Sequence, residues 1–448
     1  MMNTEKIKSQ NPWWYIPSLY FAEGLPYILI NGVSVIMYKK MGINNAQITL
    51  WTSLLYLPWV IKMLWGPFVD IYSTKRNWVI YTQIAMTFCL GAVGLSLQLP
   101  NFFFISLGVL TIGAFISATH DIAADGFYLL ALNTEQQAIY AGIRSVFYRM
   151  SVIFGTGFLV FFAGQLENKS GNIPLSWAIS FGVAAAIFGL ISAYHHFILP
   201  FPNQDAKNLT RDQTEKQTDF QTENRSTIEA QATDQETRKS DEIPFKEIVS
   251  SYFQQPKIFA ILAFILLYRF GEAMLVKLSN PFLLDSVEQG GLGLTTSEVG
   301  LVYGTFGTIS LIIGGIIGGA IVAKFGLKKT IFPLALALNL PDLFYVYMAY
   351  HRPPLNWIYP LVSLEQFGYG LGFTAFMVYL MQIAQGQYKT SHYAISTGIM
   401  ALGMMIPGIV SGQIQEAVNY PLFFVIVCIL TIPGMITIFF LPLPETQN

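Results

Sequence analysis

Long apolar segments recur along almost the whole chain and are separated by short polar stretches. A helix that crosses a bilayer needs about 20 mostly apolar residues, and a helix satisfies its own backbone hydrogen bonds in lipid. The pattern therefore predicts an all-α membrane protein with twelve transmembrane helices. The predicted spans are 13–38, 45–69, 78–98, 102–131, 138–163, 174–199, 256–283, 296–322, 329–350, 355–385, 390–416 and 420–441.

One long polar segment, Pro202–Phe245, interrupts this pattern between the sixth and seventh predicted spans. It is rich in Gln, Thr, Asp, Glu and Asn and contains almost no aliphatic residues, so it cannot bury enough apolar surface to offset the entropy of ordering. We therefore predict three parts: an N-terminal six-helix half (1–199), a mostly disordered cytoplasmic linker (200–255) and a C-terminal six-helix half (256–448).

The composition agrees with a membrane protein and excludes several other classes. Only 11% of residues are charged, whereas soluble domains carry about 25%. The formal net charge of −1 gives no electrostatic sign of a nucleic-acid partner. The only two cysteines, Cys89 and Cys428, lie in separate apolar segments, so no metal site or cofactor site is predicted. The sequence also has no phosphate-binding loop for ATP.

Basic residues in the short loops predict the orientation, because cytoplasmic loops carry an excess of Lys and Arg. Counting from a cytoplasmic N-terminus, the cytoplasmic side receives the larger group, which places both termini and the linker in the cytoplasm. This larger group is Lys6, Lys8, Lys75, Arg76, Lys257, Lys324, Lys328, Lys329 and Lys389, against Lys39, Lys40, Lys169 and Arg352.

A glycine-rich and basic loop motif occurs at equivalent places in the two halves. The first copy has Gly66, Asp70, Lys75 and Arg76, and the second has Gly319, Gly326 and Lys328, with Ala323 where Asp is expected. Both copies resemble the loop signature of the major facilitator superfamily, which reads roughly G-x-x-x-D-R-x-G-R-K. The resemblance implies the major facilitator fold and transport by alternating access around a site near the middle of the membrane.

Charged residues inside spans are costly and usually face a cavity or one another. Asp121 and Asp125 are four residues apart, so they share one face of the fourth span. Arg144 and Arg149 in the fifth span lie at a similar predicted depth. We expect carboxylate–guanidinium pairing between these two helices. A pair that opens on protonation would couple a proton to transport, and a permanent pair would be structural.

Further charges complete the set of candidate residues. Arg269 and Glu272 are three residues apart and are expected to neutralise each other, while Lys62 is expected to extend to the cytoplasmic interface. Pro26 predicts a break in the first helix beside Glu23, because proline removes a helical hydrogen bond. The candidates for proton coupling or solute contact are Glu23, His120, Asp121, Asp125, Arg144, Arg149, Arg269, Glu272, Lys277 and Glu365.

Several of these motifs resemble those of the AmpG-type muropeptide permeases. They are Phe21-Ala-Glu-Gly-Leu-Pro26, Lys62-Met-Leu-Trp-Gly-Pro-Phe-Val-Asp70, Asp121-Ile-Ala-Ala-Asp125, Tyr148-Arg149, Leu267-Tyr-Arg-Phe-Gly-Glu-Ala273 and the glycine-rich segment that follows Glu365. The resemblance implies a proton-coupled importer of anhydromuropeptides across the bacterial inner membrane for cell-wall recycling. We expect a monomer whose partners are the bilayer, a small solute and protons.

Four residues depart from the family pattern, and they keep other solutes open. His120, Glu23, Arg144 and Lys277 add charge or a titratable group to the bundle. An alternative is therefore a carrier for another anion, such as sialic acid, a siderophore or acyl-CoA. A membrane acyltransferase is disfavoured: His120 and Asp125 match its H-x-x-x-x-D spacing, but residues five apart on a helix differ by about 140° in direction. We expect no catalytic residues.

Overall fold

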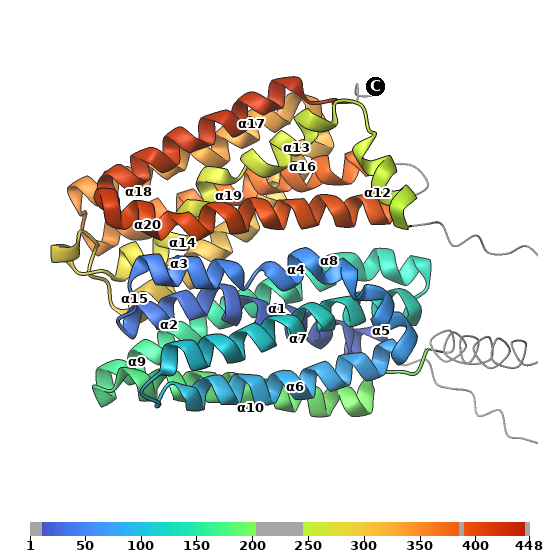
Figure 1. The fold of residues 1–448 in the computed structure, drawn as a ribbon, viewed down its shortest axis with the longest axis horizontal. Coiled ribbons are helices and arrows are strands. Elements are labelled where there is room, and N and C mark those ends of the chain that lie inside the picture. The colour runs from blue at the N-terminus through green and yellow to red at the C-terminus, as the bar shows by residue number, and fades with distance from the viewer. Residues whose placement is uncertain (1–10, 203–244, 385–388, 444–448) are drawn as a thin grey trace, which may run out of the picture.

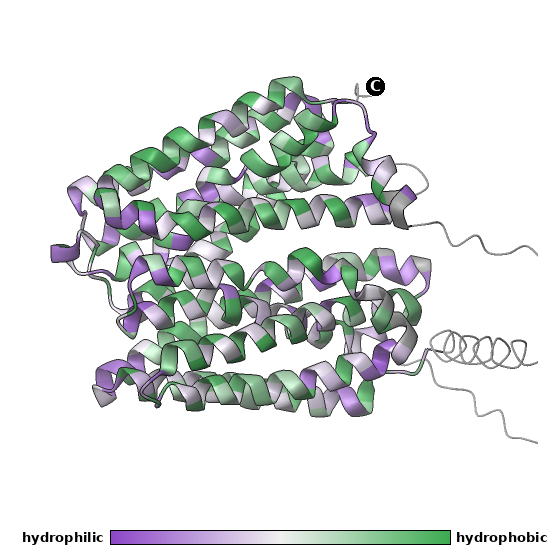
Figure 2. Ribbon diagram, in the orientation of Figure 1, coloured by the Kyte–Doolittle hydropathy of each residue, from purple (hydrophilic) through white to green (hydrophobic). Residues whose placement is uncertain are grey.

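The computed structural model describes residues 11–202, 245–384 and 389–443, without the side chains of residues 63, 67, 70, 71, 134, 138, 245, 246, 248 and 390. Throughout this described part the regular structure is helical. Figure 1 shows the N-terminal helices, in blue and green, packed as one layer against the C-terminal helices, in yellow to red. Hydrophobic residues run along the helices, and hydrophilic residues are frequent at their ends (Figure 2).

The N-terminal group contains six predicted spans, several of which change helix type along their length. Its elements are η1 (Pro12–Trp14), α1 (Ile16–Ile28), η2 (Leu29–Val33), α2 (Ser34–Lys40), α3 (Asn45–Leu54), α4 (Leu57–Ile61), η3 (Lys62–Leu64), α5 (Gly66–Tyr72), α6 (Lys75–Ser96), α7 (Phe102–Ala131), α8 (Thr134–Val152), η4 (Ile153–Leu159), α9 (Val160–Ser170) and α10 (Ile173–Ile198).

The C-terminal group begins with a short helix inside the range predicted as linker, where Tyr252 bonds to Ser396 of the bundle. Its elements are α12 (Phe245–Phe253), α13 (Ile258–Leu267), α14 (Phe270–Leu284), η5 (Val287–Gln289), α15 (Thr296–Val299), η6 (Gly300–Gly307), α16 (Thr308–Phe325), α17 (Leu327–Asn339), η7 (Leu340–Asp342), α18 (Leu343–His351), α19 (Leu355–Ile383), α20 (Lys389–Thr437) and η8 (Ile438–Phe440). Residues 203–244 of the predicted linker lie outside the described residues.

Nine helical segments of the described chain are long and apolar enough to cross a membrane. The count of twelve spans stays a prediction, because 45–69 is divided among short helices and α20 covers two predicted spans. α20 has 49 residues, which corresponds to about 70 Å of helix, more than twice the bilayer core of about 30 Å. Its non-helical dihedral angles at Asn419, φ 65° and ψ 166°, mark the place where the chain turns.

The predicted break at Pro26 is wrong. α1 continues through Pro26 to Ile28, and the wider π-helical turn of η2 follows it. The Leu29 N–H bonds to the carbonyl groups of both Leu25 and Pro26. α1 therefore accommodates Pro26 without unwinding. Glu23 consequently sits on a continuous helix.

The glycine row of the eighth predicted span brings two different neighbours into close contact. Gly304 in η6 lies against the backbone of Thr156 in η4, which belongs to the N-terminal group. About three helical turns further along, Gly314 faces the backbone of Phe367, and Gly370 in α19 faces that of Leu311. These glycines let helix backbones approach as side chains would not allow.

We expect Gly370→Ala to destabilise the protein, because its new Cβ would collide with the carbonyl oxygen of Leu311. Overpacking of this kind costs about 1–3 kcal/mol. Thermal unfolding in detergent measures the effect. Gly91→Ala is the matched control, since a Cβ at Gly91 meets no atom within 4 Å and alanine is the better helix former. Equal melting temperatures for the two variants would contradict the packing argument.

Candidate solute-binding cavity

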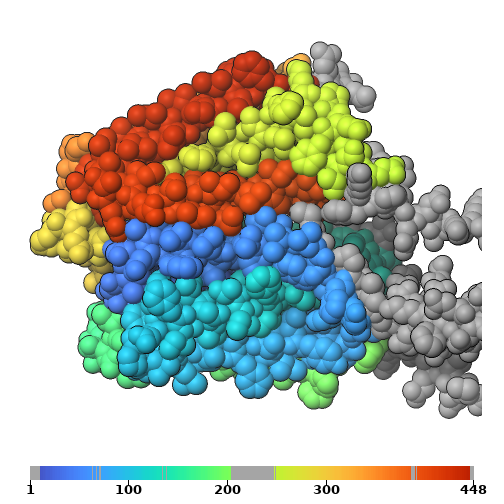
Figure 3. All heavy atoms as spheres, in the orientation of Figure 1, coloured from blue at the N-terminus to red at the C-terminus, as the bar shows by residue number. Residues whose placement is uncertain are grey.

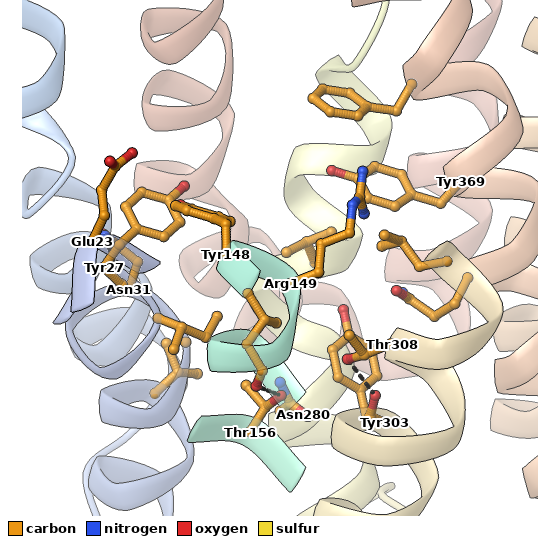
Figure 4. A pocket seen from close by; sticks show the side chains of 18 of the residues that line it. Glu23, Tyr27, Asn31, Tyr148, Arg149, Thr156, Asn280, Tyr303, Thr308 and Tyr369 are labelled. Atoms are coloured by element: carbon orange, nitrogen blue, oxygen red, sulfur yellow. Dashed lines mark hydrogen bonds between the residues drawn. The ribbon is translucent and has the colours of Figure 1, made fainter. Parts of the chain in front are cut away.

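A central space lies between the two groups of helices. It consists of two adjoining cavities of about 600 Å³ and about 570 Å³. They share Glu23, Tyr27, Tyr148 and Tyr369 in their walls. Figure 4 shows side chains of both groups pointing into the first cavity, with Glu23 and Tyr148 on one side and Tyr303 and Tyr369 on the other.

One end of this space is closed by polar contacts between the groups. Lys39, at the end of α2, forms an ion pair of 2.5 Å with Asp285. Asn45 donates from Nδ2 to Gln415 at 2.7 Å and to Tyr420 at 2.8 Å, and the Tyr420 hydroxyl donates to Asp285 at 2.6 Å. In Figure 3, α20 (orange-red) lies directly against α3 (blue) over this region. We call these five residues the polar seal.

The opposite end, where α10 ends and α12 begins, is the linker end of the bundle (Figure 1). Asp125 and Arg144 lie toward this end, and their side chains are 46% and 35% exposed although they form an ion pair of 3.0 Å. The second cavity is lined by residues of the same region, including Lys62, Gly66 and Ala394. The space is therefore sealed at one end and accessible from the linker end.

Acidic residues form one wall of the space. Asp121 accepts a hydrogen bond from Trp59 Nε1 at 2.8 Å and pairs with Lys62 at 3.8 Å. Asp125 pairs with Arg144 and accepts a hydrogen bond from the Tyr20 hydroxyl at 3.1 Å. Pairing between the fourth and fifth predicted spans is thus found for Asp125 but not for Asp121. Lys62 contacts Asp121 rather than extending to the interface as we predicted.

Three oxygen atoms in the wall of the first cavity have no hydrogen-bond partner among the described residues. They are Glu23 Oε2, Asn31 Oδ1 and Asn280 Oδ1, and all three residues line the first cavity. A buried polar atom without a partner costs about 1–3 kcal/mol. Donor groups of a bound solute or of water would remove that cost, so the wall is suited to a ligand rich in hydroxyl and amide groups.

Three further basic residues line the space, two from the C-terminal group and one from α8, and no ion pair within 4 Å joins them to an acid of the described chain. Lys277 donates to Thr52 at 3.1 Å and lies 4.9 Å from the centre of the Tyr56 ring. Arg149 extends from α8 toward Tyr369 in Figure 4. The third basic residue is Arg269.

The predicted pairing of Arg269 with Glu272 is not formed. The Arg269 guanidinium instead donates to the Tyr369 hydroxyl and lies over the Phe373 ring, 4.8 Å from its centre. The chain changes direction at Arg269, which has non-helical dihedral angles between α13 and α14, so the two side chains do not follow the regular spacing of one helix. Arg269 is thereby held at the cavity wall by aromatic contacts.

Comparisons with known proteins cover almost the whole chain. The family model described as "Major Facilitator Superfamily" matches residues 18–286 and 265–448. The chain belongs to the major facilitator superfamily. The solved structure of a D-xylose–proton symporter is similar over 97% of this chain and 98% of its own, with a TM-score of 0.71 at 11% identity. The predicted all-helical major facilitator fold is confirmed, and the protein is a multi-pass membrane transporter.

Two curated relatives agree with the resemblance to AmpG-type permeases. "Putative transporter AmpG 4" of Rickettsia felis is 24% identical over 433 residues, which is 94% of each chain. The "Anhydromuropeptide permease" of Escherichia coli K12 is 23% identical and covers 93% of this chain and 77% of its own length. The similarity thus extends over both halves of this superfamily member.

The loop signature of the superfamily lies at the linker end in both halves. Arg76 donates to the carbonyl groups of Leu199 at 3.0 Å and His196 at 2.6 Å, so it joins the start of α6 to the end of α10. Lys75 contacts Gly126 of α7. Asp70 belongs to α5, and its side chain is outside the described part.

In the second copy, Gly326 joins α16 to α17 with φ 80°, a conformation that favours glycine. Gly319 lies near the end of α16, and Lys328 near the start of α17. The role of both copies in conformational change stays a prediction, as does the part played there by Gly66.

His120 does not line the space. It bonds to Gln83 at 3.0 Å, Gln83 bonds to His195 at 3.0 Å, and His195 bonds to Ser18 at 2.9 Å. This buried chain connects α7, α6, α10 and α1 inside the N-terminal group. His120 and Asp125 therefore have separate partners and form no common site of the kind an acyltransferase needs.

Glu272 and Glu365 are fully buried and lie behind the cavity wall. A third acid, Asp342, is buried with them, and our sequence reasoning missed it. The signal was present, because Asp342 lies within the predicted span 329–350 and the rule for charges inside membranes applies to it as well. The aromatic wall, with Tyr27, Tyr56 and Tyr148, was also not identified as a cluster.

We expect Lys277→Met to raise the melting temperature of the empty protein and to weaken binding of a sugar carboxylic acid such as N-acetylmuramic acid. A buried cation without a carboxylate partner is costly, so its removal stabilises the empty state, while the ligand loses a counter-charge. Thermal unfolding in detergent, with and without the sugar acid, measures both effects.

Lys39→Met is the control for this variant, because it breaks an existing ion pair. It leaves Asp285 buried without its cation and should lower the melting temperature. A lower melting temperature for Lys277→Met, or an unchanged response to the sugar acid, would contradict the assignment of Lys277 as an anion-binding residue.

Proposed function

We propose that this transporter imports anhydromuropeptides or related amino sugars across a bacterial inner membrane, driven by the proton gradient and working as a monomer by alternating access. The observation that carries the proposal is the central space, which combines unpaired basic residues with aromatic side chains and unpartnered amide and carboxyl oxygens. The name of the Escherichia coli relative, a permease for anhydromuropeptides, supports the choice of solute.

The size and chemistry of the cavity support a sugar with carboxylate groups. A volume of about 600 Å³ lies within the range of about 300–1,000 Å³ that is usual for ligand sites. Aromatic rings such as Tyr27, Tyr148 and Tyr369 offer apolar faces for sugar rings. Arg149 and Lys277 offer charges for carboxylates of the lactyl group or the stem peptide.

The orientation follows from the loop charges together with the shape of the central space. The end with the larger number of basic residues is the linker end, so we place both termini and the linker in the cytoplasm. With that orientation the polar seal faces the periplasm, and the structure represents an inward-open state. Import then requires the polar seal to open and the linker end to close in turn.

Uptake of labelled GlcNAc-anhydroMurNAc into proteoliposomes tests this proposal. We expect accumulation above equilibrium when an inward proton gradient is imposed, and loss of accumulation when a protonophore removes the gradient. Liposomes without protein are the control. No uptake, or uptake that ignores the gradient, would contradict the proposal. Uptake of labelled sialic acid or acyl-CoA, without uptake of the muropeptide sugar, would favour a carrier for another anion.

A further inference from the structure

Three fully buried carboxyl groups meet in the C-terminal group, behind the wall of the central space. Glu272 is on α14, Asp342 on η7 and Glu365 on α19, and each has no exposed surface. No ion pair within 4 Å joins any of them to a cation among the described residues. Three ionised carboxylates cannot share such a site, because each would cost several kcal/mol of desolvation and would repel the others.

Glu272 and Asp342 face each other within hydrogen-bonding reach. Neither carboxyl group has any other hydrogen-bond partner, since all four of their oxygens lack one among the described residues. An ionised carboxylate only accepts hydrogen bonds, so two such groups can bond only when one of them carries a proton. The geometry is that of two acids that share a proton.

Asp342 ends η7 and leads directly into α18 with helical dihedral angles, φ −56° and ψ −27°. Its side chain makes no capping hydrogen bond to the helix. The Tyr345 hydroxyl, also fully buried, lies beside the same three acids and within hydrogen-bonding reach of Glu365. Glu272 and Asp342 therefore remain as the two acids that face each other.

The charges around the pair indicate which acid carries the proton. Glu272 lies next to Arg269, whose guanidinium favours its ionised form. No basic group of the described chain lies beside Asp342. Glu365 is separately satisfied, because Gln366 donates to its two oxygens at 3.2 and 3.1 Å. The titratable groups around the pair are Arg269, Glu365, Tyr303, Tyr345, Tyr369 and Cys428.

We propose that Glu272 and Asp342 form the proton-binding site of the transporter, in which Asp342 carries the proton and donates it in a hydrogen bond to Glu272. This deepens the proposed function and rests on its proton coupling. Binding transfers one proton from water to the pair, and release returns it. No other bond changes. The described residues contain no cluster of His, Cys, Asp and Glu suited to a metal ion.

The pair lies at the breaks between two pairs of helices and close to the cavity wall. Glu272 follows the break between α13 and α14, and Asp342 lies in the break between α17 and α18, where Pro341 lacks an N–H. Loss of the proton leaves two facing carboxylates that push these segments apart. Arg269 transmits the movement to Tyr369 and Phe373 in the cavity wall.

Asp342→Asn, which keeps the size and a donor group but cannot release a proton, tests the site. In proteoliposomes we expect it to lose gradient-driven accumulation of GlcNAc-anhydroMurNAc and solute-coupled proton flux, while solute counterflow is retained. Glu272→Gln should do the same. Glu288→Gln, an exposed acid of the same half, is the matched control and should accumulate solute as the natural protein does.

Infrared spectroscopy of the purified protein tests the shared proton without any solute. We expect the natural protein to show the C=O band of a protonated carboxyl group that Asp342→Asn loses and Glu288→Gln keeps. A band unaffected by Asp342→Asn would overturn the proposal. So would gradient-driven accumulation in both pair variants, accumulation driven by a sodium gradient alone, or failure of both variants to fold, which would make the pair structural.

The two measurements separate this proposal from the proposed function. If the natural protein accumulates no muropeptide sugar but the infrared band depends on Asp342, the choice of solute fails and the proton site stands. If the natural protein accumulates the sugar with the gradient and Asp342→Asn does so equally, the proton site fails and the importer stands.

Discussion

The cost of burying charge inside a membrane protein governs how this structure is organised. Acids on the N-terminal side of the central space, such as Asp121 and Asp125, have basic partners at 3.8 and 3.0 Å. On the opposite side, the Lys277 ammonium group has a hydroxyl group and an aromatic ring, but no carboxylate, as partners among the described residues. An unpaired buried charge is unfavourable. An anion bound in the central space would therefore stabilise Lys277.

The charged side chains are partnered differently in the two groups of helices. In the N-terminal group Asp121 and Asp125 accept hydrogen bonds from Trp59 and Tyr20 and pair with basic residues, whereas Glu23 Oε2 has no partner among the described residues. In the C-terminal group the basic residues face the cavity and the acids lie behind them, with Arg269 between the two layers. A solute anion at the basic residues and a proton at the acids would therefore bind in neighbouring layers of the C-terminal group, so that both would act on the same group of helices.

The fold could be predicted from the sequence because hydrophobic length and the repeated loop motif are local properties. The contact between Asp125 and Arg144 was also predictable from residue depth along two neighbouring helices. The partners of Asp121 and Arg269 were not, since irregular segments at Lys62–Leu64 and at Arg269 turn side chains away from regular helical spacing. Asp342 was overlooked although its position inside a span marked it, and its contact with Glu272 depends on packing between helices distant in sequence.

The contact of Gly304 with the backbone of Thr156 has a mechanical consequence. It joins the two groups at the wall of the first cavity, which Thr156 lines, and nearby Gly300 likewise lies against the backbone of Phe161. The side chains at this junction are small, such as Thr305 against Gly157, so few interlocking contacts must disengage and the junction can serve as a fulcrum. Separation of the groups on one side of this fulcrum then brings them together on the other, which makes simultaneous opening of both ends geometrically unfavourable.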